Sequence, residues 1–146
     1  MQPPKVFASY SHDSDEHKEW VLGLSCKLRE NGVDVILDQW DLGAGDDITL
    51  FMENGVRDSN RVLVICTDTY VRKANAGEGG VGYERLIVTA QLAQDLGTKK
   101  FIPIIRQSST DEKTPTFLAT RLYIDFADDS KFEIKVFLSL CQSVFT

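Results

Sequence analysis

The stretch 62-VLVIC-66 decides the fold class, because every one of its five positions is apolar. A strand without polar alternation belongs to a sheet that is covered on both faces, which is typical of parallel sheets. Outward from residues 62–66, short apolar or β-rich runs predict four further strands, at residues 5–10, 33–37, 101–105 and 122–124. Pro103 has no N–H donor, so we expect the strand 101–105 to pair on one side only at that residue, or to bulge there.

Helical patterns separate these strands along the chain. Residues 14–31 carry apolar side chains on one helical face, and Asn31-Gly32 supplies a stop signal. Further helices are predicted over 48–56, 83–96 and 132–145, with a long irregular segment before residue 83. The order predicts an α/β fold, a flavodoxin-like doubly wound sheet that is mainly parallel, with about five strands and helices on both faces. A chain of 146 residues has the size of one ordinary domain, so we expect residues 1–146 to form a single domain.

Composition narrows the function classes. The formal net charge is −6, so we expect no direct nucleic-acid binding, because a phosphate backbone would meet charge of its own sign. Cys26, Cys66 and Cys141 lie far apart in apolar contexts, which predicts reduced core residues of a cytoplasmic protein. The sequence has no charged-then-apolar leader and no apolar run near the roughly twenty residues of a membrane span, so we expect no membrane segment. His12 and His17 lack the partner spacing of a metal site, so we expect no metal and interpret both as solvated histidines at a helix start.

The connection 38-DQWDLGAGDD-47 is longer than the usual strand-to-helix link of about two to six residues. It concentrates four aspartates, one tryptophan and two glycines. Loops on a rigid scaffold commonly carry binding and catalysis, and a large aromatic side chain is costly to expose unless something covers it. We interpret this segment as a binding loop. The alternative is an N-cap region whose Trp40 folds back onto the core.

The predicted topology also places a site. In a flavodoxin-like sheet, ligands bind outside the carboxyl ends of the strands, at the switch point between the first and third strands. Residues 9–13, 38–47 and 67–70, with the irregular stretch beyond, converge there. A response-regulator receiver needs adjacent acids after its first strand, whereas Tyr10-Ser11 stands there. A flavodoxin needs a phosphate loop rich in Ser, Thr and Gly, and 11-SHDSD-15 is too acidic for that role.

Three motifs in this order resemble the TIR (Toll/interleukin receptor) domain family, in its bacterial NAD-consuming form. Residues 5-KVFASYS-11 resemble the box 1 strand, and 38-DQWDLGAGD-46 resemble the BB loop. Gly82-Tyr83-Glu84, opening a helix after the third strand, match the place where NAD-consuming members carry their catalytic glutamate. The resemblance covers essentially the whole chain. One departure is the glycine-rich segment 75-NAGEGGV-81, which lacks the tryptophan or cysteine that many members place there.

The glycine-rich segment also contains a dinucleotide-binding motif, but its position in the chain argues against that function. Residues 77-GEGGVG-82 spell GxGxxG, the dinucleotide fingerprint. They lie about ten residues past the third predicted strand instead of directly after it, and no acidic partner follows at the expected distance of about twenty residues. We therefore expect no Rossmann site.

The resemblance implies an NAD+ glycohydrolase (NADase) with Glu84 as its catalytic carboxylate and NAD+ as substrate, with no cofactor. The chemistry is compatible, because nicotinamide leaves as a neutral molecule and one ionised carboxylate can stabilise the oxocarbenium-like ribosyl cation. A helix N-terminus would keep Glu84 ionised, although a first-turn glutamate that serves only helix stability is the alternative. Core packing is the alternative role for one expected substrate contact, Phe7. The expected substrate-binding residues are Phe7, Ser9, Tyr10, Ser11, Asp38, Trp40, Asp41, Leu42 and Tyr83.

The loop is also expected to mediate assembly. The expected partners are NAD+, other copies of the same domain in a head-to-tail assembly, and a sensor or regulatory domain in the same or a partner chain. Self-association would activate hydrolysis or cyclisation of NAD in the effector module of a bacterial immune or antiphage protein. The alternative is a non-catalytic signalling adaptor of the TIR or SEFIR type, and Glu84, which a pure scaffold does not need, favours the enzyme. The expected assembly loop comprises Trp40, Asp41, Leu42, Gly43, Ala44, Gly45 and Asp46.

Overall fold

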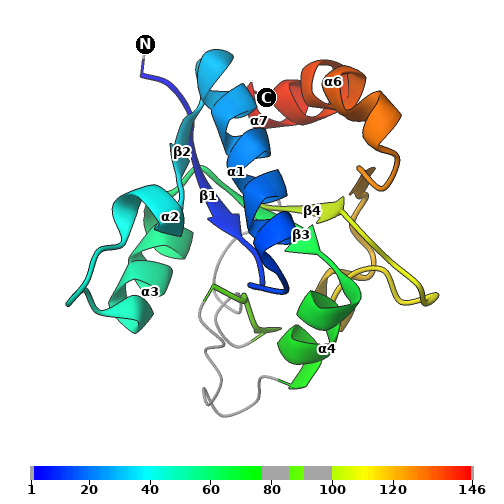
Figure 1. The fold of residues 1–146 in the computed structure, drawn as a ribbon, viewed down its shortest axis with the longest axis horizontal. Helices are drawn as coiled ribbons and strands as arrows, with labels where there is room; N and C mark the ends of the chain where they lie inside the picture. The colour runs from blue at the N-terminus through cyan, green and yellow to red at the C-terminus, as the bar shows by residue number, and fades with distance from the viewer. Residues whose placement is uncertain (1, 77–85, 91–99, 146) are drawn as a thin grey trace.

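The computed structural model describes residues 2–76, 86–90 and 100–145. Its five strands form one parallel sheet in the order β2-β1-β3-β4-β5, which confirms the flavodoxin-like α/β fold (Figure 1). β1 pairs with β2 on one side and with β3 on the other, so the switch point of the sheet lies at β1. The strands are β1 (Lys5–Ser9), β2 (Asp34–Ile36), β3 (Arg61–Cys66), β4 (Phe101–Ile105) and β5 (Ile124–Asp125).

Helices fill the connections between the strands. Figure 1 shows α1 beside the C-terminal helices, and α2 and α3 together near β2. Among the described residues, no helix is both long and apolar enough to cross a membrane. The α-helices that follow β1, β2 and β3 are α1 (Asp15–Glu30), α2 (Asp38–Asp41), α3 (Ile48–Asp58) and α4 (Asp68–Ala76). The chain ends in a helical run of α6 (Phe132–Lys135), a π-helical segment (Val136–Cys141) and α7 (Gln142–Phe145).

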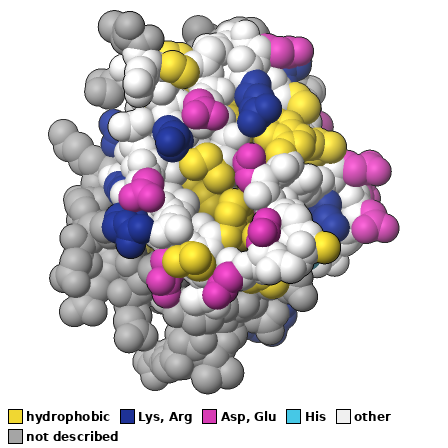
Figure 2. Space-filling model, turned by 90° about the vertical axis from the view of Figure 1, so that its left-hand side faces the viewer, with side chains coloured by type: hydrophobic (Ala, Val, Ile, Leu, Met, Phe, Trp, Pro, Cys, Tyr) yellow, Lys and Arg dark blue, Asp and Glu magenta, His cyan; other side chains and the backbone are white. Residues whose placement is uncertain are grey.

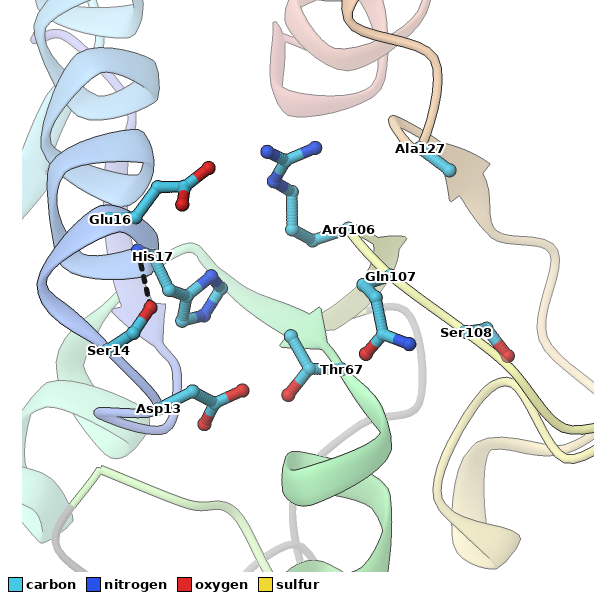
Figure 3. A pocket seen from close by; sticks show the side chains of 9 residues that line it. All are labelled: Asp13, Ser14, Glu16, His17, Thr67, Arg106, Gln107, Ser108 and Ala127. Atoms are coloured by element: carbon cyan, nitrogen blue, oxygen red, sulfur yellow. Dashed lines mark hydrogen bonds between the residues drawn. The ribbon is translucent and has the colours of Figure 1, made fainter.

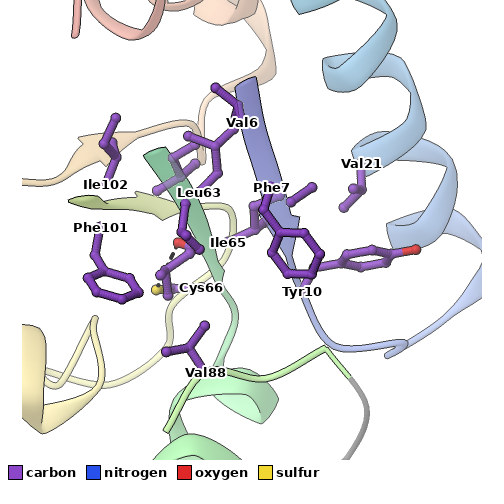
Figure 4. Close-up of a cluster of buried hydrophobic side chains, with 14 of the residues drawn as sticks. Val6, Phe7, Tyr10, Val21, Leu63, Ile65, Cys66, Val88, Phe101 and Ile102 are labelled. Carbon is purple, nitrogen blue, oxygen red and sulfur yellow. Dashed lines mark hydrogen bonds between the residues drawn. The ribbon is translucent and has the colours of Figure 1, made fainter. Parts of the chain in front are cut away.

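Side-chain alternation along β1 assigns helices to the two faces of the sheet. Phe7 packs against Phe51 of α3, with ring centroids 5.6 Å apart. Tyr10 points to the opposite face, toward α1, where its ring centroid lies 6.0 Å from that of His17. The sheet is therefore covered on both faces, as the apolar run of β3 predicts. Figure 4 shows part of the resulting core around β1 and β3.

Local signals in the sequence mark the ends of α1 correctly. Ser14 is the N-cap, and its Oγ accepts a hydrogen bond from the backbone N–H of His17 (3.1 Å). Gly32, directly after the C-cap, has φ of 86°, a left-handed conformation that favours glycine. The expectation for Pro103 is also met: Pro103 pairs with β3, and the pairing of β4 with β5 begins only at Ile104.

Helix α4 occupies part of the segment predicted to be irregular. Thr67 begins it, because its Oγ1 accepts a hydrogen bond from the N–H of Tyr70 (3.2 Å). Tyr70, Val71 and Ala74 are buried on one side of the helix. This cap and this spacing were present in the sequence, but the polar residues between them obscured the pattern.

The prediction of a helix over residues 83–96 is wrong in residues 86–89, which are not helical. The Leu86 carbonyl accepts a hydrogen bond from the Ser9 side chain, and the Val88 N–H donates to the Tyr70 hydroxyl. Side chains from β1 and α4 thus satisfy backbone groups that a helix would have paired internally.

The cysteines differ from one another in burial. Cys66 is buried and Cys141 partly buried, but Cys26 lies on the exposed side of α1, so the expectation of three core cysteines is wrong at Cys26. Burial raises the pKa of the Cys66 thiol to about 12, which keeps it protonated and unreactive.

Gly55 of α3 provides a test of the packing between α3 and β1. A Cβ atom at Gly55 would overlap the Phe7 ring, whereas one at the exposed Gly23 of α1 would meet open space. We expect Gly55→Ala to lower the free energy of unfolding by about 1–3 kcal/mol, because overpacking outweighs the gain in helix propensity. The matched change Gly23→Ala should raise it by about 0.5–1 kcal/mol. Urea denaturation measures both, and equal stabilisation by the two substitutions would contradict the packing described.

Candidate functional site

A polar cluster lies at the carboxyl ends of β1 and β2. We name it the Asp38 cluster, and it consists of Tyr10, His12, Asp38 and Gln39. The Tyr10 hydroxyl donates to Asp38 Oδ1 (2.6 Å), and His12 Nε2 lies 3.0 Å from Asp38 Oδ2. Gln39 Nε2 donates to the Tyr10 hydroxyl oxygen (2.9 Å) and to the backbone carbonyl of Lys18 (3.0 Å). Both carboxylate oxygens are therefore partnered, and the first turn of α2 is tied to β1 and α1.

Hydrogen bonding keeps the buried Asp38 carboxyl ionised. Burial by itself raises its pKa, but the bonds from His12 and Tyr10 outweigh that effect and hold the pKa of Asp38 below its ordinary value. Burial and the neighbouring carboxylate raise the pKa of Tyr10 far above its ordinary value, so its hydroxyl remains a donor. The cluster is thus a fixed negative charge, with Asp38 only 8% exposed.

On the opposite face of the sheet, Ser9 and Tyr70 hold the segment that begins at Leu86. The Ser9 Oγ and the Tyr70 hydroxyl lie 2.7 Å apart, and Ser9 Oγ also donates to the Leu86 carbonyl. The Val88 N–H donates to the Tyr70 hydroxyl (3.0 Å). Complete burial raises the pKa of Tyr70 and keeps it protonated. We name these four residues the Tyr70 anchor.

The segment 38–47 is a short helix followed by a closed turn, instead of one continuous loop. After α2, the Gly43 N–H donates to Asp46 Oδ2 (2.7 Å), and the Asp46 N–H donates to the Gly43 carbonyl (3.1 Å). Gly45 within this turn has φ of 91°, which a side chain would strain. Leu42 is half-buried and Ala44 exposed, so the turn presents a small tip with a fixed shape.

The structure brings together several residues that the sequence assigns to the site. Ser9, Tyr10, Ser11 and Asp38 all lie at the strand ends and are buried, with Tyr10 bonded to Asp38 and Ser9 facing the opposite layer. Asp41 is exposed and Leu42 half-buried at the start of the closed turn. The buried residues can therefore affect a ligand only by positioning neighbouring residues, whereas residues of the closed turn can contact a ligand directly.

Two predicted aromatic contacts lie elsewhere. Phe7 is fully buried against Phe51, which corresponds to the core-packing alternative and leaves no surface for a ligand. The Trp40 ring lies beneath the guanidinium of Arg29, 4.0 Å from ring centroid to Cζ, and Arg29 Nη2 also donates to the Val35 carbonyl (3.2 Å). This contact holds Trp40 along edge strand β2 and covers one side of the ring.

The two remaining predicted residues, Tyr83 and Glu84, lie outside the described residues. The described chain resumes at Leu86, two positions after Glu84. The Tyr70 anchor therefore holds the chain directly downstream of the expected catalytic glutamate.

A second feature of the strand ends is a cavity of about 430 Å³, on the side of the β1–α1 connection that faces β4 (Figure 3). Residues that follow β1, β3, β4 and β5 contribute to it, as does the first turn of α1. The side chains that give it its chemistry are Asp13, Glu16, His17, Thr67, Arg106 and Gln107.

His17 and Arg106 face each other across this cavity (Figure 3). His17 is only 7% exposed, and its Nε2 has no hydrogen-bond partner among the described residues. Burial lowers the pKa of His17, Asp13 partly opposes the shift, and Arg106 adds to it, so the imidazole is neutral near pH 7. The Arg106 Nη1 donates to Asp129 (2.9 Å), and the guanidinium lies 4.8 Å from the Trp20 ring centroid.

The expectation of a solvated histidine at the helix start is therefore wrong at His17, whereas His12 is exposed as expected. His17 faces inward because it lies one turn before Val21 on the buried side of α1, a spacing that was visible in the sequence. His12 precedes the helix and binds Asp38. Arg106 was not identified, because it lies in no motif and only the folded sheet brings it to the site. Tyr70 belongs to the segment 67–70 that was expected there, but its contacts with Ser9 and Val88 were not predicted.

The ionised state of Asp38 makes a pH-dependent contribution to stability. Because its folded pKa is depressed, this contribution is present above the unfolded pKa of about 3.9 and is lost as the pH falls through the folded pKa. We expect Asp38→Asn to lower the free energy of unfolding by about 1–2 kcal/mol at pH 7, since charged hydrogen bonds are lost. The difference from the unmodified protein should shrink on acidification. Denaturation at several pH values, with the exposed Asp34→Asn as control, tests this, and a difference that is independent of pH would contradict it.

Comparison with known proteins agrees with the observed topology. The chain is 39% identical to a prokaryotic SEFIR domain of known structure, with a TM-score of 0.86, covering 98% of this chain and 99% of that one. The TIR domain of the Toll-related receptor TRR-2 from Hydra magnipapillata shares the fold, with 20% identity, a TM-score of 0.66, and coverage of 97% and 98% of the two chains.

One curated relative is an enzyme, the 2' cyclic ADP-D-ribose synthase BtTIR of Bacteroides thetaiotaomicron. It is 27% identical over 113 residues, which is 76% of this chain, and the match spans 37% of that protein. The sequence profile of the TIR domain matches residues 6–141. The chain therefore belongs to the TIR domain family.

Proposed function

We propose that this TIR domain cleaves NAD+ with release of nicotinamide, and that Glu84 is the catalytic carboxylate. The observation that carries the proposal is the Tyr70 anchor, which ties the chain two residues beyond Glu84 to β1 at the switch point of the sheet. Ligands of doubly wound folds bind at this point. The similarity to a 2' cyclic ADP-D-ribose synthase supports the same reaction class.

The proposed chemistry breaks the bond between the nicotinamide nitrogen and C1' of the ribose. Nicotinamide departs with the bonding electron pair as a neutral molecule, and the ribosyl group acquires oxocarbenium character. The Glu84 carboxylate stabilises that cation. Water then adds to C1' and loses a proton to give ADP-ribose, or a hydroxyl of the same molecule adds and loses its proton to give a cyclic product.

The described residues have supporting roles in this proposal. Asp38 is a fixed negative charge near the developing cation, and its bonds to Tyr10 and His12 keep it in one position. Ser9 fixes the position of the chain just after Glu84, because its side chain donates a hydrogen bond to the Leu86 carbonyl. Direct contacts with the nicotinamide riboside are assigned to Leu42 of the closed turn and to Tyr83.

Replacing the proposed carboxylate tests the enzymatic proposal. We expect Glu84→Gln to reduce nicotinamide release by about 100-fold or more, since one electrostatic group in the transition state is lost. Thermal unfolding should change little. Glu53→Gln, an exposed glutamate on α3, is the control and should retain full activity. Intact turnover by a folded Glu84→Gln protein would end the assignment of Glu84.

We also propose that head-to-tail self-association completes the active site. The chain has a net charge of −6, so one copy offers few cations for the pyrophosphate of NAD+. The face that carries α2, α3 and edge strand β2 gathers hydrophobic side chains among charged ones (Figure 2). Trp40 and Leu50, which are 36% and 54% exposed, belong to these elements. A contact between this face and a different surface of the next copy would form open filaments.

The exposed tip of the closed turn provides the test. Ala44→Glu should abolish both assembly and NAD+ cleavage while leaving the monomer folded, because a charge at the tip would be buried in the contact. The same substitution at the exposed Ala119, in the connection before β5, is the control. Light scattering and nicotinamide release measure the two effects. If dilute monomer turned over NAD+ as fast per subunit as the assembly, the proposal that self-association completes the active site would be wrong.

In the proposed setting, the domain is the effector module of a cytoplasmic bacterial immune or antiphage protein, and a sensor domain controls its assembly. A second candidate function is a non-catalytic signalling adaptor of the TIR or SEFIR type, and it is kept because the chain is 39% identical to a prokaryotic SEFIR domain. If the protein is an adaptor, its Glu84→Gln variant should assemble normally, and the unmodified protein should not consume NAD+ even when it is clustered. The two functions are therefore distinguished by the same protein preparations.

A further inference from the structure

We propose that the cavity between α1 and the ends of β3 and β4 is a second binding site, for a neutral hydroxyl-bearing molecule of nucleoside size. Its volume of about 430 Å³ lies within the range of small-molecule sites. It lies on the α1 side of the β1–α1 connection, whereas the Tyr70 anchor lies on the opposite face of the sheet. The inference rests on this cavity alone and does not depend on NAD+ cleavage.

The buried imidazole is the main evidence for a ligand. His17 is 93% covered, points into the cavity, and has a ring nitrogen without a partner among the described residues. A buried polar atom without a hydrogen bond destabilises the fold, and a ligand that bonded to Nε2 would remove that destabilisation. A neutral imidazole can offer that nitrogen as donor or acceptor, according to its tautomer.

The charges of the lining exclude anionic ligands. Asp13 and Glu16 bring two carboxylates to the wall. Among the described residues that line the cavity, Arg106 is the one cation, and it is already paired with Asp129. A phosphate would therefore meet a net negative surface. Two carboxylates are instead good acceptors for a pair of hydroxyl groups, such as the cis-diol of a ribose.

Arg106 is suited to a planar group. The structure pairs one of its five N–H donors with Asp129, and the guanidinium lies over the Trp20 ring, with Cζ 4.8 Å from the ring centroid. Guanidinium groups stack on flat unsaturated rings and donate hydrogen bonds at their edges. A heterocyclic base joined to a ribose has the planar group, the acceptors and the diol that this lining requires.

Hydrogen bonds within the chain hold the walls of the cavity. Ser14 caps α1 and so fixes the start of the helix that carries Glu16 and His17. Asp68 accepts hydrogen bonds from the Gln107 side chain (2.9 Å) and the Ser109 backbone N–H (3.1 Å), which holds the chain after β4. Little ordering cost is therefore left for binding.

The test uses adenosine as the probe, titrated into the full chain and followed by amide and imidazole chemical shifts. Saturable shifts should appear at His17, Thr67 and Ser108. His17→Phe keeps the ring packing against Tyr10 and removes the polar nitrogen, so it should weaken binding about fivefold to tenfold. Adenosine 5'-monophosphate should bind more weakly than adenosine, and Glu16→Gln should narrow that difference. Glu19→Gln, one turn further along α1 and exposed, is the matched control and should bind adenosine as the unmodified protein does.

Each result decides the proposal. Absence of saturable shifts at the cavity would overturn it, as would unchanged affinity in a folded His17→Phe protein. Tighter binding of the monophosphate than of adenosine would also overturn it, because the acidic wall would then not control access. If His17→Phe does not fold, His17→Gln is measured instead. Its amide can replace the ring nitrogen, so binding should persist there and be lost in His17→Leu.

Discussion

The central position of β1 is the constraint on which the other features depend. Because β1 pairs in parallel with both β2 and β3, the chain must leave it in one direction over α1 and return later on the other face. Successive residues at the end of β1 therefore face opposite layers. Ser9 contacts α4 and the segment 86–88, while Tyr10 contacts α1 and the start of α2. One strand end thus supplies polar groups to both layers at the position where the sheet is open to ligands.

Tyr10 lies between the two sites at the strand ends. Its hydroxyl belongs to the Asp38 cluster, and its ring lies 4.9 Å from His12 and 6.0 Å from His17, which faces the cavity. A change in the position of His17 would thus reach the Asp38 carboxylate through one buried aromatic ring. Close packing makes such contacts stiff, so the two sites are mechanically adjacent although they open on different sides of the β1–α1 connection.

Apolar periodicity predicted the sheet well, because a strand buried on both faces leaves a continuous apolar run and a capped helix leaves terminal signals. β3, β4 and the ends of α1 are examples. The helix predicted over 83–96 fails in residues 86–89 for a physical reason: the apolar residues there are buried by the sheet, and side chains of Ser9 and Tyr70 replace the helical hydrogen bonds. No local pattern encodes a partner that lies 77 residues away in sequence.

The same distinction between local patterns and distant contacts holds for the candidate site. Asp38 could be identified because it stands at a strand end in an unusual loop, and the structure adds the partners that keep it charged. Arg106 could not be identified, because a single arginine after a strand has no distinctive spacing. Its importance comes from Trp20 and Asp129, which belong to different elements and meet only when α1 and the C-terminal region lie side by side.

The distribution of charge gives the strand ends different preferences for ligands. Asp38 is buried and ionised, so it favours a group that becomes positive, which is what breaking a glycosidic bond to a pyridinium ring generates. The cavity on the other side has exposed carboxylates opposed by an arginine that is already paired, so it favours a neutral group instead. The negative net charge disfavours phosphates around both sites, which agrees with the proposal that cations of a second copy complete the active site.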